Sequence, residues 1–422
     1  MSRPIRWLWW CLIVSVVLAG CGAKDEETTP SPAPTTDSTA AAPELTPTQD
    51  PGLLPTSPAG AIFPTGPFTF TVWTTEQFAP NDTNTGARLL LDQLLEFDRN
   101  HSEMELDIVV KRPTGPGSIM DYFETASPVA PTVLPDLVVL NDEMLVQARE
   151  QEIVQALDEL IPPVLLDDLF PVADRLSRID DLLVSVPFRL EFEHLVFNTT
   201  VFTDTAPSTW DEVLDSGGPY IFPAALEAPI DTTLLHYLAA GGGLYNRDGR
   251  PDFDQDQLTE VFRFYQQAFN SRVIPAAALQ TRSLTFAWNA YLTGNALIAH
   301  VNASSYLSGR GDLLNTAVGA VVGPNRTGVP LISAWHWAVV TTDPTRQQLA
   351  VDLIAWLMEA DNLGVWSFAS QWLPSTAGAL AAWPTDDDYA DFAREQMLLG
   401  LPRPDATYYA EVQSRLTEGV LA

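Results

Sequence analysis

The amino-acid sequence predicts an α/β protein with two lobes, preceded by an N-terminal segment of different composition. From Phe68 to Arg149, strand-like and helix-like patterns alternate, an order typical of a parallel sheet covered by helices. The part with folded character is about 350 residues long. That is more than one hydrophobic core usually serves, so we expect two lobes. Residues before about position 65 lack both patterns.

The first twenty residues predict a secretory signal. Met1 to Arg6 carries two arginines and no acid, and Trp7 to Ala19 is almost wholly apolar. This apolar stretch is too short for a comfortable membrane span. It ends in Leu18-Ala19-Gly20-Cys21, which resembles a lipobox, so we expect cleavage after residue 20 and a diacylglycerol on Cys21. The alternative is a plain secretory signal followed by an unmodified cysteine.

Cysteine count and charge exclude several classes of function. The chain has two cysteines, Cys11 within the signal and Cys21 at the expected anchor, so the mature protein has no disulfide and no thiol catalysis. Its formal net charge is -32, which excludes nucleic acid as a partner and favours solubility outside the cell. The acidity leaves open a cationic ligand.

Residues 21–65 predict a flexible tether. They are rich in Pro, Thr, Ser and Ala and hold almost no aromatic residue before the end, so they cannot bury enough apolar surface to fold. About 40 such residues would span roughly 35 Å. The tether would hold the folded part, residues 66–422, close to the outer face of the cytoplasmic membrane.

The first half of the folded part predicts a parallel sheet. Phe68 to Trp73 alternates and is β-rich, so it predicts a strand. The patterns that follow predict a helix over 84–100, a strand over 105–111, a short helix over 118–125, a buried strand over 134–140 and a helix over 141–149 that Asn141 caps.

The second half mixes helices with short strands. We expect strands over 182–187, 194–197, 296–301 and 331–341. Ser208 is expected to cap a helix that ends at Asp215, with Trp210 packed beneath its start. Further helices are predicted over 234–240, 257–270, 286–293 and 344–360, and Trp356 lies on the apolar face of the last of these.

Six segments together resemble one known family. Their order and spacing are similar to those of the extracellular solute-binding proteins of ABC importers, which include the maltose-type binding proteins. The segments are Phe70–Trp73, Leu134–Leu140, Gln155–Leu160, Val186–Phe188 with Leu195–Thr199, Pro207–Val213, and Gly294–Ile298. Two positions depart from the family pattern, since Ser333–Trp337 replaces a Gly-Gly pair and Asn295 replaces a common lysine.

The resemblance implies a two-lobed type II periplasmic-binding-protein-like fold with a hinge cleft. The first lobe would comprise about 66–190 and part of the C-terminal segment, and the second about 195–320 and the C-terminal helices. The resemblance also implies a monomer that captures a small-molecule solute and delivers it to ABC permease subunits. It implies neither a cofactor nor catalysis.

Tryptophans supply the candidate ligand contacts, because an aromatic ring stacks well on the apolar face of a sugar. Trp73 ends a strand at the edge where α/β sheets bind ligands. Trp335 and Trp337 alternate on a strand, so they point to one side and His336 to the other. For each of these tryptophans the competing interpretation is packing in the core or at its rim.

Two further tryptophans belong to the predicted site. Trp288 would share a helix face with Tyr291. Trp372 precedes Leu373-Pro374 and resembles a family segment that borders the cleft. We therefore expect a carbohydrate ligand, with core packing as the competing interpretation of Trp288.

Polar candidates lie where the chain passes between the expected lobes. Arg189, Glu191 and Glu193 follow Pro187-Phe188 and are expected to bind a ligand or to form a solvated hinge edge. Asn141 follows a buried strand, where it would either contact the ligand or cap a helix.

Motifs for catalysis and metal binding are weak. The five histidines show no close pair at metal-ligand spacing, and Gly241–Gly243 is not followed by the residues of a phosphate loop. Acidic residues from Asp248 to Asp256 miss the EF-hand spacing, so an Asp-Gly turn competes with calcium binding there. We predict neither an enzyme nor a metal site.

Three alternative functions remain open from the sequence. A sensor lipoprotein that presents its ligand to a membrane receptor would have the same sequence features. The same fold with an acidic cleft would bind a cation such as a polyamine. An extracellular carbohydrate-active enzyme would need two carboxylates that face each other roughly 5 to 9.5 Å apart.

Overall fold

The computed structural model describes residues 67–127, 130–203, 205–224, 231–246, 253–404 and residue 416. Contacts divide the chain between Ile62 and Phe63. The predicted signal, Cys21 and the tether lie outside the described residues, as do Asp248 and Asp252 of the candidate calcium segment. In the described ranges, no helix is long and apolar enough to cross a membrane.

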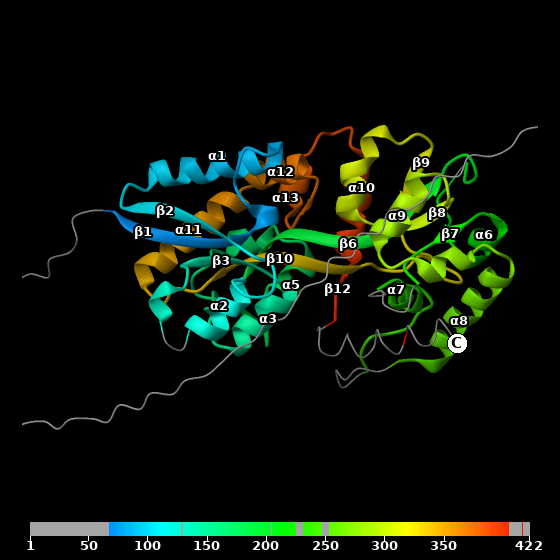
Figure 1. Cartoon of the computed structure of the whole chain (residues 1–422), viewed down its shortest axis with the longest axis horizontal. Helices are drawn as coiled ribbons and strands as arrows, with labels where there is room; N and C mark the ends of the chain where they lie inside the picture. The colour runs from blue at the N-terminus through cyan, green and yellow to red at the C-terminus, as the bar shows by residue number, and fades with distance from the viewer. Residues whose placement is uncertain are drawn as a thin grey trace, which may run out of the picture. The chain divides into compact units, whose positions relative to one another are not determined.

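The first half of the described chain forms the predicted parallel sheet. Its neighbouring strands run in the order β2-β1-β3, and helices connect them (Figure 1). The side chains of Asn84, Ser118 and Asn141 each accept a hydrogen bond from a backbone N–H in the first turn of a helix. The predicted elements are confirmed as β1 (Phe68–Thr75), α1 (Thr85–Asn100), β2 (Met104–Lys111), α2 (Ile119–Ala126), β3 (Leu137–Asn141) and α3 (Asp142–Glu150).

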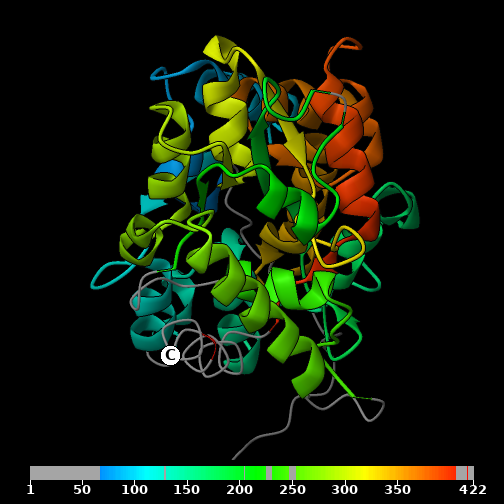
Figure 2. The same cartoon turned by 90° about the vertical axis from the view of Figure 1, so that its right-hand side faces the viewer.

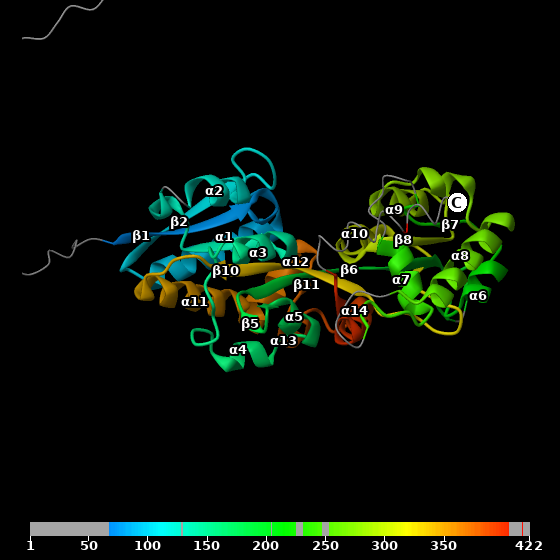
Figure 3. The same cartoon turned by 90° about the horizontal axis from the view of Figure 1, so that it is seen from below.

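Two long antiparallel strands continue this sheet into the second half. They are β6 (Val186–Asn198) and β10 (Leu331–Val339). Beyond the end of its pairing with β10, β6 pairs with β8 (Ile298–Asn302) and β9 (Thr316–Gly319). Figure 3 shows β6 and β10 running between the two groups of helices. We call β6 and β10 the crossover strands.

The structure corrects the prediction of two separate strands over 182–187 and 194–197. Leu182–Leu183 is a short strand, β5, in a hairpin with β4 (Arg178–Ile179), whereas β6 is continuous for 13 residues. The polar residues between Phe188 and His194 look like a break in the sequence. They are tolerated within a buried strand because their side chains find polar partners.

The structure also corrects one helix cap. Thr209, and not Ser208, is the N-cap of α6, and its hydroxyl accepts the N–H of Glu212. Ser208 lies one residue earlier, where its N–H and hydroxyl donate to the Glu212 carboxylate. Trp210 is buried beneath the helix start, as predicted.

The other predicted helices and strands agree with the structure in type and approximate position, and the structure adds several short elements that the sequence patterns did not predict. The predicted helix over 344–360 ends at Met358, and a new helix starts at Ala360. The other elements are α4 (Pro163–Asp167), α5 (Pro171–Leu176), α6 (Trp210–Asp215), β7 (Tyr220–Ile221), α7 (Asp231–Ala239), α8 (Gln255–Asn270), α9 (Leu284–Leu292), α10 (Ala303–Gly309), α11 (Pro344–Met358), α12 (Ala360–Ser370), β11 (Leu373–Pro374), α13 (Ala377–Ala381), α14 (Asp388–Leu399) and β12 (Leu401–Pro402), with 3-10 turns η1 (Glu76–Phe78), η2 (Pro131–Val133), η3 (Ala276–Gln280) and η4 (Arg310–Asp312).

Hydrophobic side chains form two main cores and a smaller one. The first core packs one face of β1, β3 and β10 against α1 and α11 to α14, and the smaller core fills the other face beneath α2 and α3. The second core packs the far end of β6 and β8 against α6 to α9, whose green helices face the viewer in Figure 2. The two main cores are joined by the crossover strands. The predicted residue limits of each lobe remain a prediction.

The close approach of α12 to α13 gives a testable consequence. A Cβ atom at Gly364 would lie 2.7 Å from the Ala379 carbonyl oxygen and 2.7 Å from the Ala382 Cβ. Gly364→Ala should therefore lower the free energy of unfolding by about 1–3 kcal/mol, despite the better helix propensity of alanine. Urea unfolding measures the change. Gly311→Ala is the matched control, since its Cβ would meet no atom within 4 Å; equal stability of the two variants would contradict the packing.

Candidate functional site

A buried arginine marks the middle of β6. Arg189 is 9% exposed, and its Nη2 donates to Glu191 Oε2 at 2.9 Å. The guanidinium lies 4.7 Å from the ring centroid of Trp372 and 5.9 Å from that of Phe78, within the range of cation–π attraction. Burial lowers the pKa of Arg189, and the Glu191 carboxylate opposes that shift. The Arg189 Nε atom has no hydrogen-bond partner among the described residues, so it is a donor that they leave unused.

Glu191 joins this arginine to the second half of the molecule. Its carboxylate accepts hydrogen bonds from the N–H and from the hydroxyl of Ser304, in the first turn of α10. A carboxylate at a helix N-terminus is favoured by the helix dipole. The sequence predicted Arg189 and Glu191 as polar contacts but missed Ser304, whose only signal was its place just after a strand.

Aromatic rings surround the same point. Phe78 contacts Trp335 at 5.0 Å and Trp372 at 5.0 Å between ring centroids, both edge to face. Trp335 and Trp372 are half-buried, so part of each indole remains accessible. We call this group the crossover cluster. It consists of Phe78, Arg189, Glu191, Ser304, Trp335 and Trp372.

Trp337 lies in the interior, although it is only two residues from Trp335. It is 5% exposed and stacks on Phe188 at 4.9 Å. The pairing register of β10 shifts between Trp335 and His336, and the His336 ring contacts Ser185 and Asp142. Both indoles pack against the first core, but only Trp335 belongs to the crossover cluster, and a ligand contact at Trp337 remains a prediction.

Trp73 is occupied by contacts within the chain. It is 3% exposed, and the ammonium of Lys111 lies 4.2 Å from its ring centroid and 3.7 Å from that of Tyr122. Lys111 is the only lysine after Lys24 in the sequence. It pairs in register with Thr75, and within the described part of the chain the hydroxyls of Thr74 and Thr75 have no hydrogen-bond partner. The sequence patterns did not predict that Lys111 lies beside Trp73, Thr74 and Thr75, although Lys111 is the single lysine of the folded part.

Asn141 and Trp288 complete the predicted set. Asn141 Oδ1 accepts the Met144 N–H at 2.8 Å, so the capping role is realised, and Asn141 pairs in register with Trp335 of the crossover cluster. Trp288 belongs to the second core, where it stacks on Tyr291 at 5.9 Å with the rings nearly parallel. Their shared helix face is confirmed, and a ligand contact at Trp288 remains a prediction.

The described residues offer no arrangement of three or more His, Cys, Asp or Glu side chains that could hold a metal ion. Asp254, at the end of the candidate calcium segment, uses its carboxylate to cap α8 by accepting the N–H groups of Asp256 and Gln257. The carboxylate of Asp254 thus has a structural role.

A match to a known protein family decides which class of protein this chain is. Residues 104–393 match a family described as bacterial extracellular solute-binding protein. The chain belongs to this family. The family consists of extracellular binding proteins, so the protein acts outside the cytoplasm and binds a solute.

Known relatives share the fold at low sequence identity. The maltotriose-binding protein of Pyrococcus abyssi (strain GE5 / Orsay) is 23% identical over 159 residues, which are 36% of this chain and 35% of that relative, so the chain matches about a third of its length. The cyclic α-maltosyl-1,6-maltose binding protein of Arthrobacter globiformis has a TM-score of 0.69 at 18% identity, covering 84% of this chain and 94% of that one. The Thermus thermophilus maltotriose-binding protein, solved with maltotriose bound, has a TM-score of 0.60 at 16% identity, and the match covers 83% of this chain and 93% of that one. The predicted two-lobed type II fold is confirmed.

The Arg189–Glu191 pair supplies a test of the crossover cluster. Glu191→Ala should lower the free energy of unfolding by roughly 3 kcal/mol, because it leaves a buried guanidinium without its carboxylate. The double variant Arg189→Met/Glu191→Ala should lose less, since it removes the unpaired charge as well. Urea unfolding of Glu191→Ala, of Arg189→Met and of the double variant measures the difference. A double variant as unstable as the sum of its single variants would show that the pair is not coupled.

Proposed function

We propose that this protein captures a carbohydrate outside the cell and delivers it to the permease subunits of an ABC importer. The observation that carries the proposal is the crossover cluster. It places the half-buried indoles of Trp335 and Trp372 beside an arginine–glutamate pair on β6, one of the strands that join the two cores. A sugar needs this combination, because its C–H faces are apolar and its hydroxyls seek polar partners.

Relatives support the carbohydrate class. The proteins with this fold are named for binding maltotriose or cyclic α-maltosyl-1,6-maltose, or were solved with maltose bound. In the proposed site, Trp335 and Trp372 stack on the sugar, while Arg189 and Glu191 bind its hydroxyls. Asn141 lies on the strand beside Trp335 and completes the polar contacts. Trp73, Trp288 and Trp337 are each less than a tenth exposed and pack in three different cores, and ligand contacts by these three indoles stay a prediction.

The crossover strands also provide a mechanism for delivery. Each strand packs in both main cores, so bending β6 and β10 would change the angle between the two cores. A ligand that contacts both sides binds the closed form better and shifts the population toward it. Glu191 already connects β6 to α10, so a ligand on Glu191 would act on both sides of the hinge.

A cationic ligand at Trp73 is less well supported. The rings of Trp73 and Tyr122 that could hold an ammonium group already hold that of Lys111. A sensor role or an enzymatic role gains no supporting contact within the described residues.

Binding measurements test the carbohydrate proposal. Isothermal titration against a panel of mono- and oligosaccharides should show saturable heat for at least one α-glucan oligosaccharide. Trp335→Ala and Trp372→Ala should each weaken that affinity by at least about tenfold, or ~1.4 kcal/mol, because each removes a stacking face. Trp356→Phe is the control and should keep the affinity, since Trp356 belongs to α11 and its indole N–H donates to the Gln93 backbone carbonyl on α1, away from the crossover cluster. Flat heats across the whole panel would contradict the proposal.

The anchor is proposed from the sequence. We propose that Cys21 carries lipid and that residues 21–65 form the tether. The protein would act as a monomer at the outer face of the cytoplasmic membrane. Cys21→Ser should move the protein from the membrane fraction to the soluble fraction and abolish labelling by radioactive fatty acid. Cys11→Ser, within the signal, is the control and should leave both unchanged; membrane retention of the Cys21→Ser protein in its cleaved form would contradict the anchor.

A further inference from the structure

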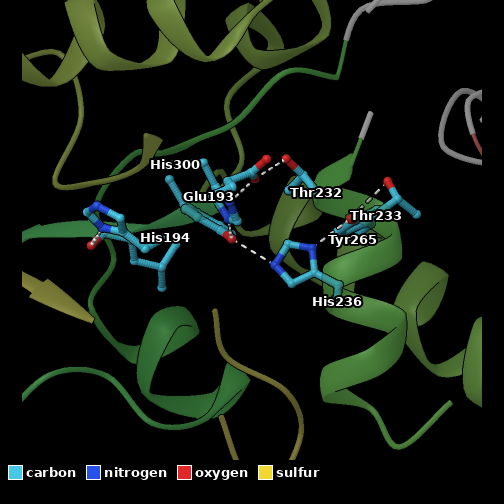
Figure 4. A network of polar contacts seen from close by, with 9 residues as sticks. Glu193, His194, Thr232, Thr233, His236, Tyr265 and His300 are labelled. Carbon is cyan, nitrogen blue, oxygen red and sulfur yellow. Dashed lines mark hydrogen bonds and ion pairs between the residues drawn. The ribbon is translucent and has the colours of Figure 1, made fainter. Parts of the chain in front are cut away.

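Glu193 lies on β6 two residues beyond Glu191, but its side chain enters the second core. The residue is 7% exposed. Its Oε1 atom accepts the hydroxyl of Thr232 at 2.5 Å and lies 2.5 Å from Nδ1 of His300 (Figure 4). A carboxyl group with so little solvent is costly to ionise, so its polar partners decide its charge.

A chain of polar contacts continues from His300 through the core. His300 Nε2 contacts the hydroxyl of Tyr220, which lies 2.8 Å from Nε2 of His236. His236 Nδ1 lies 2.8 Å from the hydroxyl of Tyr265, which lies 3.2 Å from Oγ1 of Thr233. Five elements supply this chain, namely β6, β8, β7, α7 and α8, and all its members are buried.

Each inner member of the chain can donate only one hydrogen bond along it. Burial lowers the pKa of His300 to about 3 and that of His236 well below its ordinary value, so both rings are neutral and carry one N–H. Each tyrosine has one O–H, and burial raises the pKa of Tyr220 and Tyr265. The direction of one hydrogen bond therefore fixes the direction of all the others.

Two arrangements satisfy the contacts from Glu193 to Tyr265. When Glu193 is ionised, His300 Nδ1–H donates to it, Tyr220 donates to His300, and the bonds run toward the carboxylate from Tyr265 onward. When Glu193 is protonated, its O–H donates to His300 Nδ1, and every bond runs the other way as far as Thr233. The added proton comes from solvent, and every other group keeps the number of protons it had.

Groups on every packed element influence this carboxyl. Burial raises the pKa of Glu193 to about 7, against the hydrogen bond from Thr232 and the charge of Arg403, both of which lower it. Arg403 also pairs with Asp231 of α7 at 3.0 Å. The remaining titratable neighbours are His300 of β8, Tyr220 of β7, His236 of α7, Tyr265 of α8, and Glu191 and His194 on β6 itself.

We infer that Glu193 and this chain form a proton-operated switch, in which uptake of one proton by the carboxyl reverses the chain and exchanges the tautomers of His300 and His236. The switch goes beyond solute capture, because it needs no ligand. Its place is nonetheless at the hinge, since Glu193 pairs in register with Asn302, the N-cap of the helix whose Ser304 binds Glu191. The pH outside the cell would thus act on the strand that joins the cores.

Nitrogen NMR tests the switch directly. In the full chain labelled with 15N-histidine, long-range 1H–15N spectra between pH 5.5 and 8.5 should show both rings changing tautomer with one shared midpoint. His300 should pass from Nε2–H to Nδ1–H as pH rises, and His236 from Nδ1–H to Nε2–H. His194 is the internal control, because its Nδ1–H donates to the Leu195 carbonyl and cannot reverse. Fixed tautomers for His300 and His236 across this range would overturn the inference.

Two variants separate the parts of the switch. Glu193→Gln should hold both rings in the low-pH tautomers at every pH, because its amide N–H donates to His300 as the acid does. Tyr220→Phe removes the link between the rings, so His300 should still change tautomer while His236 does not. If His236 continued to change in Tyr220→Phe, the chain would not carry the signal.

Thermal unfolding provides a readout that needs no spectral assignment. The pKa of Glu193 is raised from an ordinary 4.5 to about 7 on folding, so the folded state binds more protons between those values. The stability from this carboxyl is complete below pH 4.5 and is lost as pH rises through about 7. The melting temperature of the wild type should therefore fall relative to that of Glu193→Gln between pH 5 and 7.5. Above pH 7.5 the difference between the two melting temperatures should stay constant. A constant difference between the two proteins from pH 5 to 7.5 would overturn the inference.

Discussion

Two strands pass through both hydrophobic cores, and every polar side chain on them needs a partner. An unpaired polar group in such a position costs several kcal/mol. On β6 the solution differs at each step: Arg189 pairs with Glu191, Glu191 also binds Ser304, and Glu193 joins the buried histidine chain. The polar residues that make β6 look interrupted in sequence are therefore the ones that connect it to the rest of the molecule.

This pairing also creates the candidate site. Because the Arg189 guanidinium lies near the rings of Trp372 and Phe78, the guanidinium and the half-buried indoles lie together. A sugar placed there would contact the strands that join the cores and the carboxylate that reaches α10. Recognition and hinge bending would then depend on the same few side chains, which is an economical arrangement for a binding protein that must present its closed form to a permease.

Local sequence patterns predicted much of the fold, but they could not predict contacts between residues that are far apart in the sequence. The helices and strands from β1 to α3 follow from periodicity and from capping by Asn84, Ser118 and Asn141. The continuity of β6 does not, because Glu191 and Ser304 are 113 positions apart and Glu193 and His300 are 107 apart. The aromatic pattern likewise predicted the same role for Trp335 and Trp337. In the structure Trp337 is buried against Phe188, whereas Trp335 is half-buried. The histidine chain escaped notice because its rings come from separate elements.

In the proposed mechanism, a sugar bound at the crossover cluster closes the angle between the two main cores by bending β6 and β10. The most direct measurement is the distance between dyes on exposed positions of α1 and α8, using Glu96→Cys and Gln266→Cys in a chain whose own two cysteines are replaced by serine. Energy transfer should rise as the sugar saturates, and the midpoint of that rise should move to an at least about tenfold higher sugar concentration when Trp335 is alanine. An unchanged distance while titration calorimetry shows saturated binding would contradict this mechanism.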